Sequence, residues 1–200
     1  GVEILPIDKK IKHISFLKEK VLLFTGSLFY EPNVTAIKWL IQDIMPILWK
    51  ADNKITLRIA GRNPTKNIKE LCSKDARIKL IPNPLDIYKH IENSSINLAP
   101  MKTGSGQQFK IIEALMLCKP VVATSKAANP LGLENYKNIL ISDDSKGFAN
   151  SILELLSNQS LYLKLIKNGR KFIKDHHDWE FITKDLFQII NEGFVQYNYK

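Results

Sequence analysis

The stretch that decides the fold is residues 96–124, INLAPMKTGSGQQFKIIEALMLCKPVVAT. Ile96 to Ala99 predicts a buried strand, and the apolar run that begins at Pro120 predicts another. Between them, a glycine-containing loop at 102–106 leads into a helix from about Gln107 to Leu117. A strand, a loop, a helix and a second strand form the repeating unit of a parallel sheet, because a parallel crossover needs about a helix's length of chain.

The same alternation extends in both directions from this stretch. Further strands are expected at Val21–Thr25, Ile55–Ala60, Ile78–Ile81 and Ile139–Ile141, and helices after Pro32 with a kink at Pro46, at Asn67–Ser73, and from an Asp86 N-cap through Ile91. We therefore expect an α/β fold, a Rossmann-like parallel sheet of about six strands with helices on both faces. From Lys146 onward only helical spacing remains, with Asp178 as the cap of the last helix. Residues 1–200 are thus expected to form a single domain, an α/β core of about 20–145 followed by a C-terminal helical tail at 146–200.

Composition is that of an ordinary folded chain. The 200 residues are 44% hydrophobic and 24% charged, with no low-complexity block, which argues against disorder. No apolar run approaches the roughly 18 residues that a membrane-spanning helix needs. The sequence shows no initiator Met and no secretory signal, so we expect a cytoplasmic fragment of something longer. Cys72 and Cys118 lie in helical patterns and are expected to be buried thiols in a reducing compartment.

The charge balance is basic but dispersed. Lys and Arg outnumber Asp and Glu by 29 to 20, which gives a net charge of +9. Such a balance favours polyanionic partners such as nucleic acid, anionic lipid or phosphorylated substrates. The lysines are nevertheless scattered among Asn and Ile in every segment, rather than grouped on one face with stacking aromatics. The pattern therefore fits an ordinary solvated surface and argues against a nucleic-acid partner.

Four of the nine glycines lie where a ligand of a parallel sheet would bind. Gly26 and Gly61 each follow a predicted strand, and such ligands bind at the carboxyl ends of the strands. Gly104 and Gly106 lie between a strand and a helix. A loop of this kind presents unpaired N–H groups beside the positive end of the helix dipole. It predicts a cradle for phosphate or another anion, although any one of these glycines can equally well serve only to make a tight turn.

Polar side chains near these glycines extend the candidate site. Lys110 and Glu113 are three residues apart on one helix face, where they form either an ordinary surface ion pair or part of a nucleotide site. In the second case Lys110 neutralises phosphate charge and Glu113 accepts hydrogen bonds from a ribose. Ser27, Arg62 and Asn63 follow the strand-ending glycines, either as ordinary loop residues or as residues that reach the same crevice.

Other chemistries lack their motifs. His13, His90, His176 and His177 have no ligand spacing with Cys or carboxylates, so no metal is predicted. The sequence has no nucleophile elbow, no Walker A loop and no dinucleotide fingerprint after the first strand. Hydrolase, kinase and dehydrogenase functions are therefore disfavoured.

Residues 99–124 resemble the donor-site signature of GT-B glycosyltransferases, specifically of family 4, also called group 1. FTGSLFYEPN at 24–33 is similar to the first strand and loop of that family's C-terminal domain, and IAGRNP at 59–64 is similar to its second. Similar segments follow in the family's order at 127–133 and 178–180, so the resemblance covers nearly the whole chain. It implies that the chain is the C-terminal, donor-binding half of a GT-B fold.

The resemblance also implies a reaction. Members of the family are retaining transferases that move a sugar from a nucleotide-diphosphate donor to an acceptor, here a glycan or a lipid-linked glycan in polysaccharide or cell-surface glycan biosynthesis. No metal or other cofactor is implied. The acceptor site would belong to a missing N-terminal half, so the chain alone is expected to be inactive. We further expect the chain to pair with that half, or to form a homodimer in its absence. Peripheral contact with the inner face of the membrane is also expected.

Roles for individual residues follow from the same resemblance. Glu113 matches the last Glu of the family's Glu-x7-Glu motif and would hold the ribose hydroxyls, and Lys110 matches a basic position of the subgroup with this loop. These two are the catalytic candidates. The segment 81–84 would meet the base through main-chain groups. The implied donor-binding set is Gly26, Ser27, Arg62, Asn83, Gly104, Ser105, Gly106, Gln107 and Glu113.

Two alternatives stay open, and departures from the family pattern favour one of them. Ser105 stands where the motif has its first Glu, and Gln107 and Gln108 replace what is often Thr-Arg. The Arg and Lys that many members carry after the first strand are also missing from 27–33. Fewer fixed charges fit a degenerate, non-catalytic GT-B interaction domain. The other alternative is half of a GT-B nucleotide-sugar epimerase, although such enzymes use cleft carboxylates and His, of which this half offers few.

Overall fold

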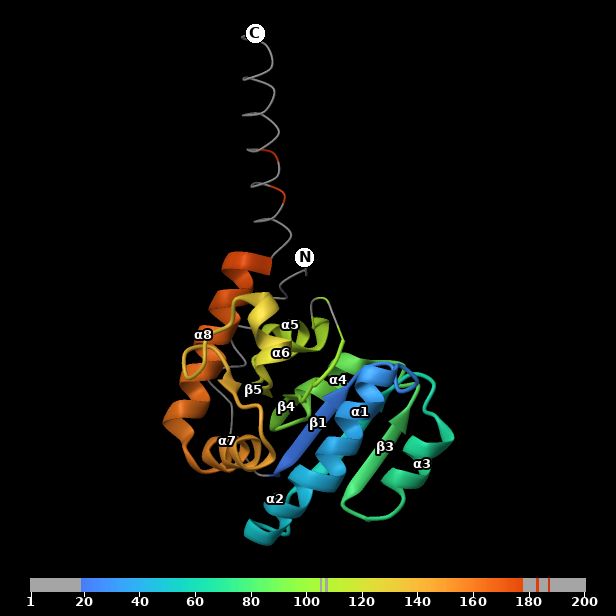
Figure 1. Cartoon of the computed structure of the whole chain (residues 1–200). Helices are drawn as coiled ribbons and strands as arrows, with labels where there is room; N and C mark the ends of the chain where they lie inside the picture. Colours follow the sequence, from blue (N-terminus) through green and yellow to red (C-terminus); the bar gives the residue numbers. More distant parts are fainter. Residues whose placement is uncertain (1–18, 105, 107, 178–182, 184–186, 188–200) are drawn as a thin grey trace, which may run out of the picture.

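The computed structural model describes residues 19–104, 106, 108–177, 183 and 187 (Figure 1). Within these residues one six-stranded sheet has the order β3-β2-β1-β4-β5-β6, and all of its pairings are parallel. The strands are β1 (Val21–Thr25), β2 (Thr56–Gly61), β3 (Ile78–Pro82), β4 (Ile96–Ala99), β5 (Val121–Ala123) and β6 (Leu140–Ile141). The predicted sheet is confirmed. Its strand order reverses between β1 and β4, and in open α/β sheets the ligand crevice lies at such a reversal.

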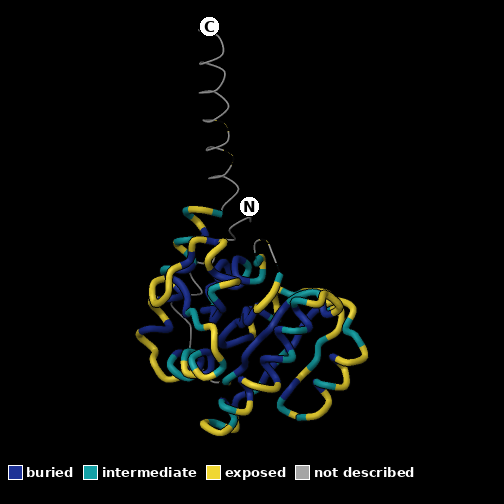
Figure 2. The backbone as a smooth tube through the Cα atoms, in the orientation of Figure 1, coloured by how far each residue is buried: buried dark blue, intermediate teal, exposed yellow. Residues whose placement is uncertain are grey.

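Helices cover both faces of the sheet, as predicted (Figure 1). On one face lie α1 (Glu31–Trp39), the π-helical turn η2 (Leu40–Ile44), α2 (Met45–Ala51), α3 (Lys66–Cys72) and α7 (Ser145–Ser157). On the other lie α4 (Ile87–Glu92), α5 (Phe109–Met116) and α8 (Gln159–His177). The short helices α6 (Ser125–Ala128) and η3 (Asn129–Leu131) lead from β5 toward β6. Two covered faces explain why every residue of β1, β4 and β5 is buried (Figure 2).

The end of one strand and the form of one helix kink differ from the predictions. Gly61, expected to follow the second strand, is its last residue and pairs with Pro82 of β3. The kink expected at Pro46 takes the form of the π-helical turn before it, in which the N–H of Met45 donates to the carbonyl of Leu40. Proline lacks an N–H and collides with the preceding turn, and the wider π turn accommodates it. The sequence thus predicts the position of the helix irregularity but not its π-helical form.

The helical tail begins as expected. α7 buries an apolar face made of Phe148, Ile152, Leu155 and Leu156. α8 packs on α5 and buries Leu161 and Leu165, whereas Phe172 is only partly buried. The expected cap at Asp178 and most of the tail beyond it lie outside the described residues. The assignment of the whole chain to a single domain stays a prediction.

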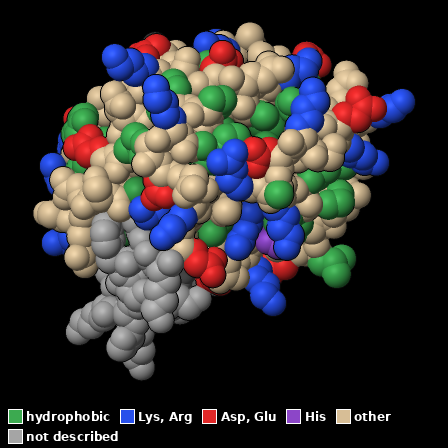
Figure 3. Space-filling view, turned by 90° about the horizontal axis from the view of Figure 1, so that it is seen from below, with side chains coloured by type: hydrophobic (Ala, Val, Ile, Leu, Met, Phe, Trp, Pro, Cys, Tyr) green, Lys and Arg blue, Asp and Glu red, His purple; other side chains and the backbone are tan. Residues whose placement is uncertain are grey.

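The two thiols and the surface charges complete the fold. Cys72 ends α3 and is buried as predicted. Cys118 is also buried, but it follows α5 in a left-handed conformation with φ +57°, so its helical prediction is wrong. Lys and Arg side chains lie among Asp and Glu side chains over the face shown in Figure 3, as their scatter in the sequence predicts. None of the helices in the described part of the chain is long and apolar enough to cross a membrane.

Candidate functional site

A cleft of about 370 Å³ opens at the carboxyl ends of β1 and β2. Its walls come from the loops that follow β1, β2 and β3 and from the first two turns of α5. The lining residues are Thr25, Gly26, Ser27, Gly61, Arg62, Pro84, Leu85, Ile87, Phe109, Lys110 and Glu113. The structure thus brings together five predicted site residues, namely Gly26, Ser27, Arg62, Lys110 and Glu113.

Two glycines allow the floor of the cleft to form. A Cβ on Gly61 would lie 1.7 Å from the carbonyl oxygen of Gly26, so no side chain fits there. Gly26 itself has φ +152°, and a Cβ on it would lie 2.8 Å from Nδ2 of Asn33. The loops are also joined by hydrogen bonds, since the Leu28 N–H donates to the Arg62 carbonyl over 2.8 Å. Gly61 is therefore required by the close approach of two backbones, and Gly26 by its positive φ and by the space that the Asn33 side chain takes.

Lys110 places an amino group at this floor among neutral partners. Its Nζ donates to Oδ1 of Asn33 over 2.8 Å and lies 3.5 Å from Sδ of Met101. The same atom lies 4.2 Å from the centroid of the Phe24 ring. Burial lowers the pKa of Lys110 to about 7, and the carboxylate of Glu113 opposes this shift. The site thus holds an amino group that titrates near neutral pH, and the charge of its protonated form is only partly balanced by Glu113.

Glu113 lies one turn further along α5. Its side chain is half-buried, and burial raises its pKa while Lys110 opposes the rise. Burial raises the pKa of the Tyr88 phenol on α4, and the carboxylate of Glu113 raises it further. A carboxylate only accepts hydrogen bonds. Glu113 is therefore suited to a ligand that offers hydroxyl groups to the cleft.

Asn33 is the site residue that sequence reasoning missed. It lies in the first turn of α1 and is 6% exposed. Its Nδ2 donates to the carbonyl of Ser27 over 2.9 Å, and its Oδ1 accepts from Lys110. The sequence places this polar residue after Pro32, at the opening of a predicted helix and at the end of the stretch 24–33, and gives it no role of its own. Its role depends on a residue 77 positions away, which no local pattern indicates.

Asn83 holds loops together beside the cleft. Its Oδ1 accepts from the N–H of Asn63 over 2.9 Å, and its own N–H donates to the carbonyl of Gly61 over 2.8 Å. Both asparagines are in the left-handed region, with φ +50° and +52°, where Asn is tolerated better than most residues. The neighbouring Pro84 and Leu85 form the cleft wall. The predicted contact of Asn83 with a base stays a prediction.

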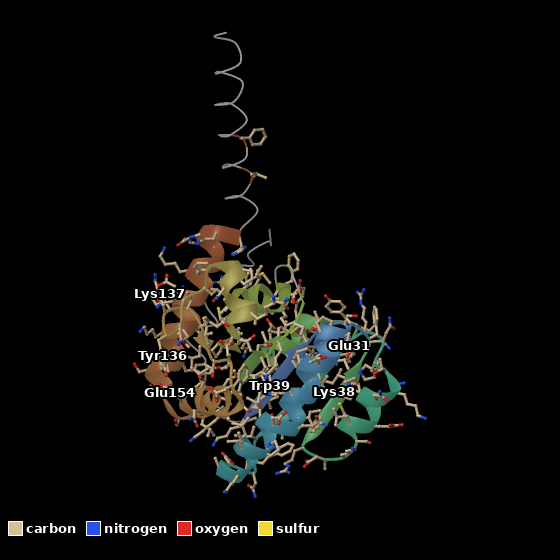
Figure 4. The ribbon with its side chains drawn as sticks, viewed as in Figure 1. Glu31, Lys38, Trp39, Tyr136, Lys137 and Glu154 are labelled. Atoms are coloured by element: carbon tan, nitrogen blue, oxygen red, sulfur yellow. The ribbon has the colours of Figure 1, made fainter. Side chains whose placement is uncertain are left out.

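The glycine-rich loop before α5 rests on α1. A Cβ on Gly104, which has φ +97°, would lie 3.2 Å from Cβ of Pro32. Nζ of Lys102 lies 4.0 Å from the ring centroid of Trp39, and this ring meets Phe148 of α7 edge-on. Figure 4 shows the position of Trp39 on α1. Ser105 and Gln107 lie outside the described residues. The donor contacts expected of them, and of Gly104 and Gly106, therefore stay predictions.

Residues 19–158 match the family model described as glycosyl transferases group 1. The chain belongs to this family. The matched range begins just before β1 and ends just after α7, so all residues that line the cleft fall within it. The resemblance found in the sequence is confirmed.

Solved glycosyltransferase structures share the fold of this group 1 chain. A TarM mutant of S. aureus in complex with Fondaparinux, alpha-GlcNAc-glycerol and UDP has a TM-score of 0.77 at 21% identity, over 95% of this chain and 38% of that one. Anabaena Alr3699/HepE in complex with UDP and glucose has a TM-score of 0.73 at 16% identity, over 96% and 55%. The C-terminal domain of LpcC, a group 1 family protein of Francisella tularensis, has a TM-score of 0.69 at 19% identity, over 90% and 100%. The chain therefore has the fold of the C-terminal half of a GT-B glycosyltransferase.

A curated relative gives the same picture of length. The "uncharacterized 44.6 kDa protein in cps region" of Klebsiella pneumoniae is 26% identical over 193 residues, which make up 92% of this chain and 50% of the relative. The chain thus spans about half the length of the curated relative that it matches.

Proposed function

We propose that this chain is the donor-binding half of a retaining glycosyltransferase that moves a sugar from a nucleoside diphosphate donor to a glycan or lipid-linked acceptor. Family membership supplies glycosyl transfer in general. The observation that carries the donor-binding role is Lys110, a half-buried residue whose amino group contacts neutral partners in a cleft at the carboxyl edge of the sheet. A cation in that setting favours an anionic ligand.

The diphosphate of the donor would lie between Lys110 and the loop of Gly26 and Ser27. The first N–H groups of α5 have no partner within the helix and add the positive end of its dipole. Cleavage of the bond to the sugar leaves negative charge on the departing diphosphate, and fixed groups that stabilise this charge lower the barrier. Lys110 and these N–H groups take that role in our proposal, which includes no metal and no other cofactor.

The nucleoside would occupy the rest of the cleft. Glu113 is placed to accept hydrogen bonds from the ribose hydroxyls, because its carboxylate lines the cleft one turn beyond Lys110. Arg62, Pro84 and Leu85 form a wall against which a base can pack. UDP is the nucleotide in the TarM and HepE complexes named above, so UDP is the first nucleotide to test.

The acceptor and the pathway belong to the whole protein. We place the acceptor site in the half that this chain lacks, so the chain alone should bind a donor and transfer no sugar. The cps-region relative supports a role in polysaccharide biosynthesis. A cytoplasmic location, contact with the inner face of the membrane and formation of a homodimer are part of the same proposal.

Calorimetric titration tests the donor-binding role directly. The 200-residue chain would be titrated with UDP, GDP, ADP and their sugar conjugates, and so would Glu113→Ala and the control Glu70→Ala, which alters an exposed carboxylate on α3. We expect one nucleoside diphosphate to bind, and its binding to be lost in Glu113→Ala but kept in the control. Absence of binding at millimolar concentration would contradict the proposal and favour a non-catalytic interaction domain, which Ser105 already suggests.

A further inference from the structure

The carboxamide of Asn33 connects two walls of the cleft. Its Nδ2 donates to the carbonyl of Ser27 over 2.9 Å, in the loop after β1, and its Oδ1 accepts from Nζ of Lys110 over 2.8 Å, on α5. The residue is 6% exposed, so both of its polar atoms act inside the protein. Asn33 therefore fixes the distance between the loop and the lysine amino group.

The orientation of this amide is determined by its partners. A backbone carbonyl can only accept a hydrogen bond, so the NH₂ group must face Ser27 and the oxygen must face Lys110. A Cβ on Gly26 would lie 2.8 Å from Nδ2 of Asn33 and 3.3 Å from Nζ of Lys110. Gly26 thus leaves the space in which the amide and the amino group meet.

Because the amide of Asn33 is neutral, it accepts a hydrogen bond from Lys110 without neutralising the positive charge, which a ligand can then do. The thioether of Met101 and the ring of Phe24, which also contact Nζ, carry no charge. Among the described residues, the charged and titratable groups around the cleft include Glu113 on the same helix and Arg62 in the loop after β2. Tyr88 on α4 interacts electrostatically with both Glu113 and Asp86. A carboxylate in place of the Asn33 amide would pair with the ammonium and compete with an incoming phosphate.

We propose that Asn33 is a positioning residue that holds the amino group of Lys110 in the cleft without neutralising it, so that the diphosphate of the donor becomes its main counter-charge. The inference rests on the proposed function for the identity of the ligand. The contact between Asn33 and Lys110 does not depend on that identity.

The test is Asn33→Asp, which keeps the size of the side chain, adds a negative charge and replaces the Nδ2 donor to the Ser27 carbonyl with an oxygen. UDP and UMP would be titrated by calorimetry at pH 7, 8 and 9 into the wild-type chain, Asn33→Asp and the control Asn67→Asp, which adds the same charge at an exposed position on α3.

We expect Asn33→Asp to bind UDP at least about tenfold more weakly at pH 7, with a smaller loss for UMP. Wild-type affinity for UDP should fall between pH 7 and pH 9 as Lys110 loses its proton, and Asn33→Asp should lose this dependence because the added carboxylate retains the proton. Asn67→Asp should behave as the wild type.

Two outcomes would overturn the inference, and they differ from a failure of the proposed function. An equal loss of UDP and UMP affinity with an unchanged pH profile would indicate that Asn33 only supports the fold. A ligand-free measurement, ¹³C NMR of the lysine Cε with the Lys110 signal assigned by its loss in Lys110→Met, should show the pKa of Lys110 rising in Asn33→Asp. An unchanged pKa would mean that the contact itself is wrong. If the pKa rises but the wild-type chain binds no UDP, the contact stands, whereas the proposed function and the diphosphate role of Asn33 both fall.

Discussion

Lys110→Met removes the amino group from the cleft floor and keeps the length of the side chain, so its effect on stability should depend on pH. Burial lowers the pKa of Lys110 in the folded chain to about 7, against 10.5 for an ordinary lysine. The unfolded chain therefore binds this proton more tightly, and the difference destabilises the fold. The cost is complete below about pH 7 and shrinks as pH rises toward 10.5.

The size of the change follows from these two values. At about 1.4 kcal/mol per pKa unit, the cost of burying the charge falls by about 2 kcal/mol between pH 7 and pH 9. The free energy of unfolding of Lys110→Met minus that of the wild type should therefore decrease by about 2 kcal/mol over this interval. The variant also leaves Oδ1 of Asn33 without its lysine partner, at a cost of roughly 1–3 kcal/mol. That cost is the same at both pH values and cancels in the comparison.

Urea unfolding at pH 7, 8 and 9 measures this difference. The control is Lys126→Met, which makes the same substitution at an exposed position on α6. Burial also raises the pKa values of Cys72 and Tyr162, but both residues are common to the variant and the wild type, so their titration cancels in the difference. A difference for Lys110→Met that is constant from pH 7 to pH 9 would refute the claim that the fold desolvates this amino group.

Three further predictions concern the same part of the molecule. UDP binding at pH 8 should take up a proton, because the diphosphate favours the charged form of Lys110; calorimetry in buffers of different ionisation enthalpy measures this, and zero uptake would mean that the diphosphate does not meet the lysine. Gly61→Ala should lower the free energy of unfolding by roughly 3 kcal/mol or more, since its Cβ would lie 1.7 Å from the Gly26 carbonyl oxygen; unchanged urea unfolding would contradict the close approach of the two loops. Lys102→Gln should lose the contact with Trp39, at a cost of about 0.5–1 kcal/mol, and a double-mutant cycle with Trp39→Leu should recover a coupling of that size.

The parts that could be predicted from sequence are those encoded in neighbouring residues. Apolar runs indicated the strands, and the glycines that follow two of these runs indicated the edge at which the cleft opens. Asp86 indicated the start of α4, where it caps the N–H of Lys89 as expected. The contact between Asn33 and Lys110 could not be found in this way, because α1 and α5 lie on opposite faces of the sheet and only the finished fold brings the two side chains together. The left-handed backbone of Cys118 could not be predicted either, because the residue is neither glycine nor asparagine, which are the residues that indicate this conformation.

The cost of holding Lys110 in the cleft has a consequence for engineering. A group that destabilises the fold at neutral pH is one that selection for heat resistance alone would remove, and an apolar residue at position 110 is the simplest replacement. Selection for stability would therefore favour substitutions at position 110, on which the proposed ligand binding depends. Libraries built on this scaffold should therefore be scored for nucleotide affinity and melting temperature together.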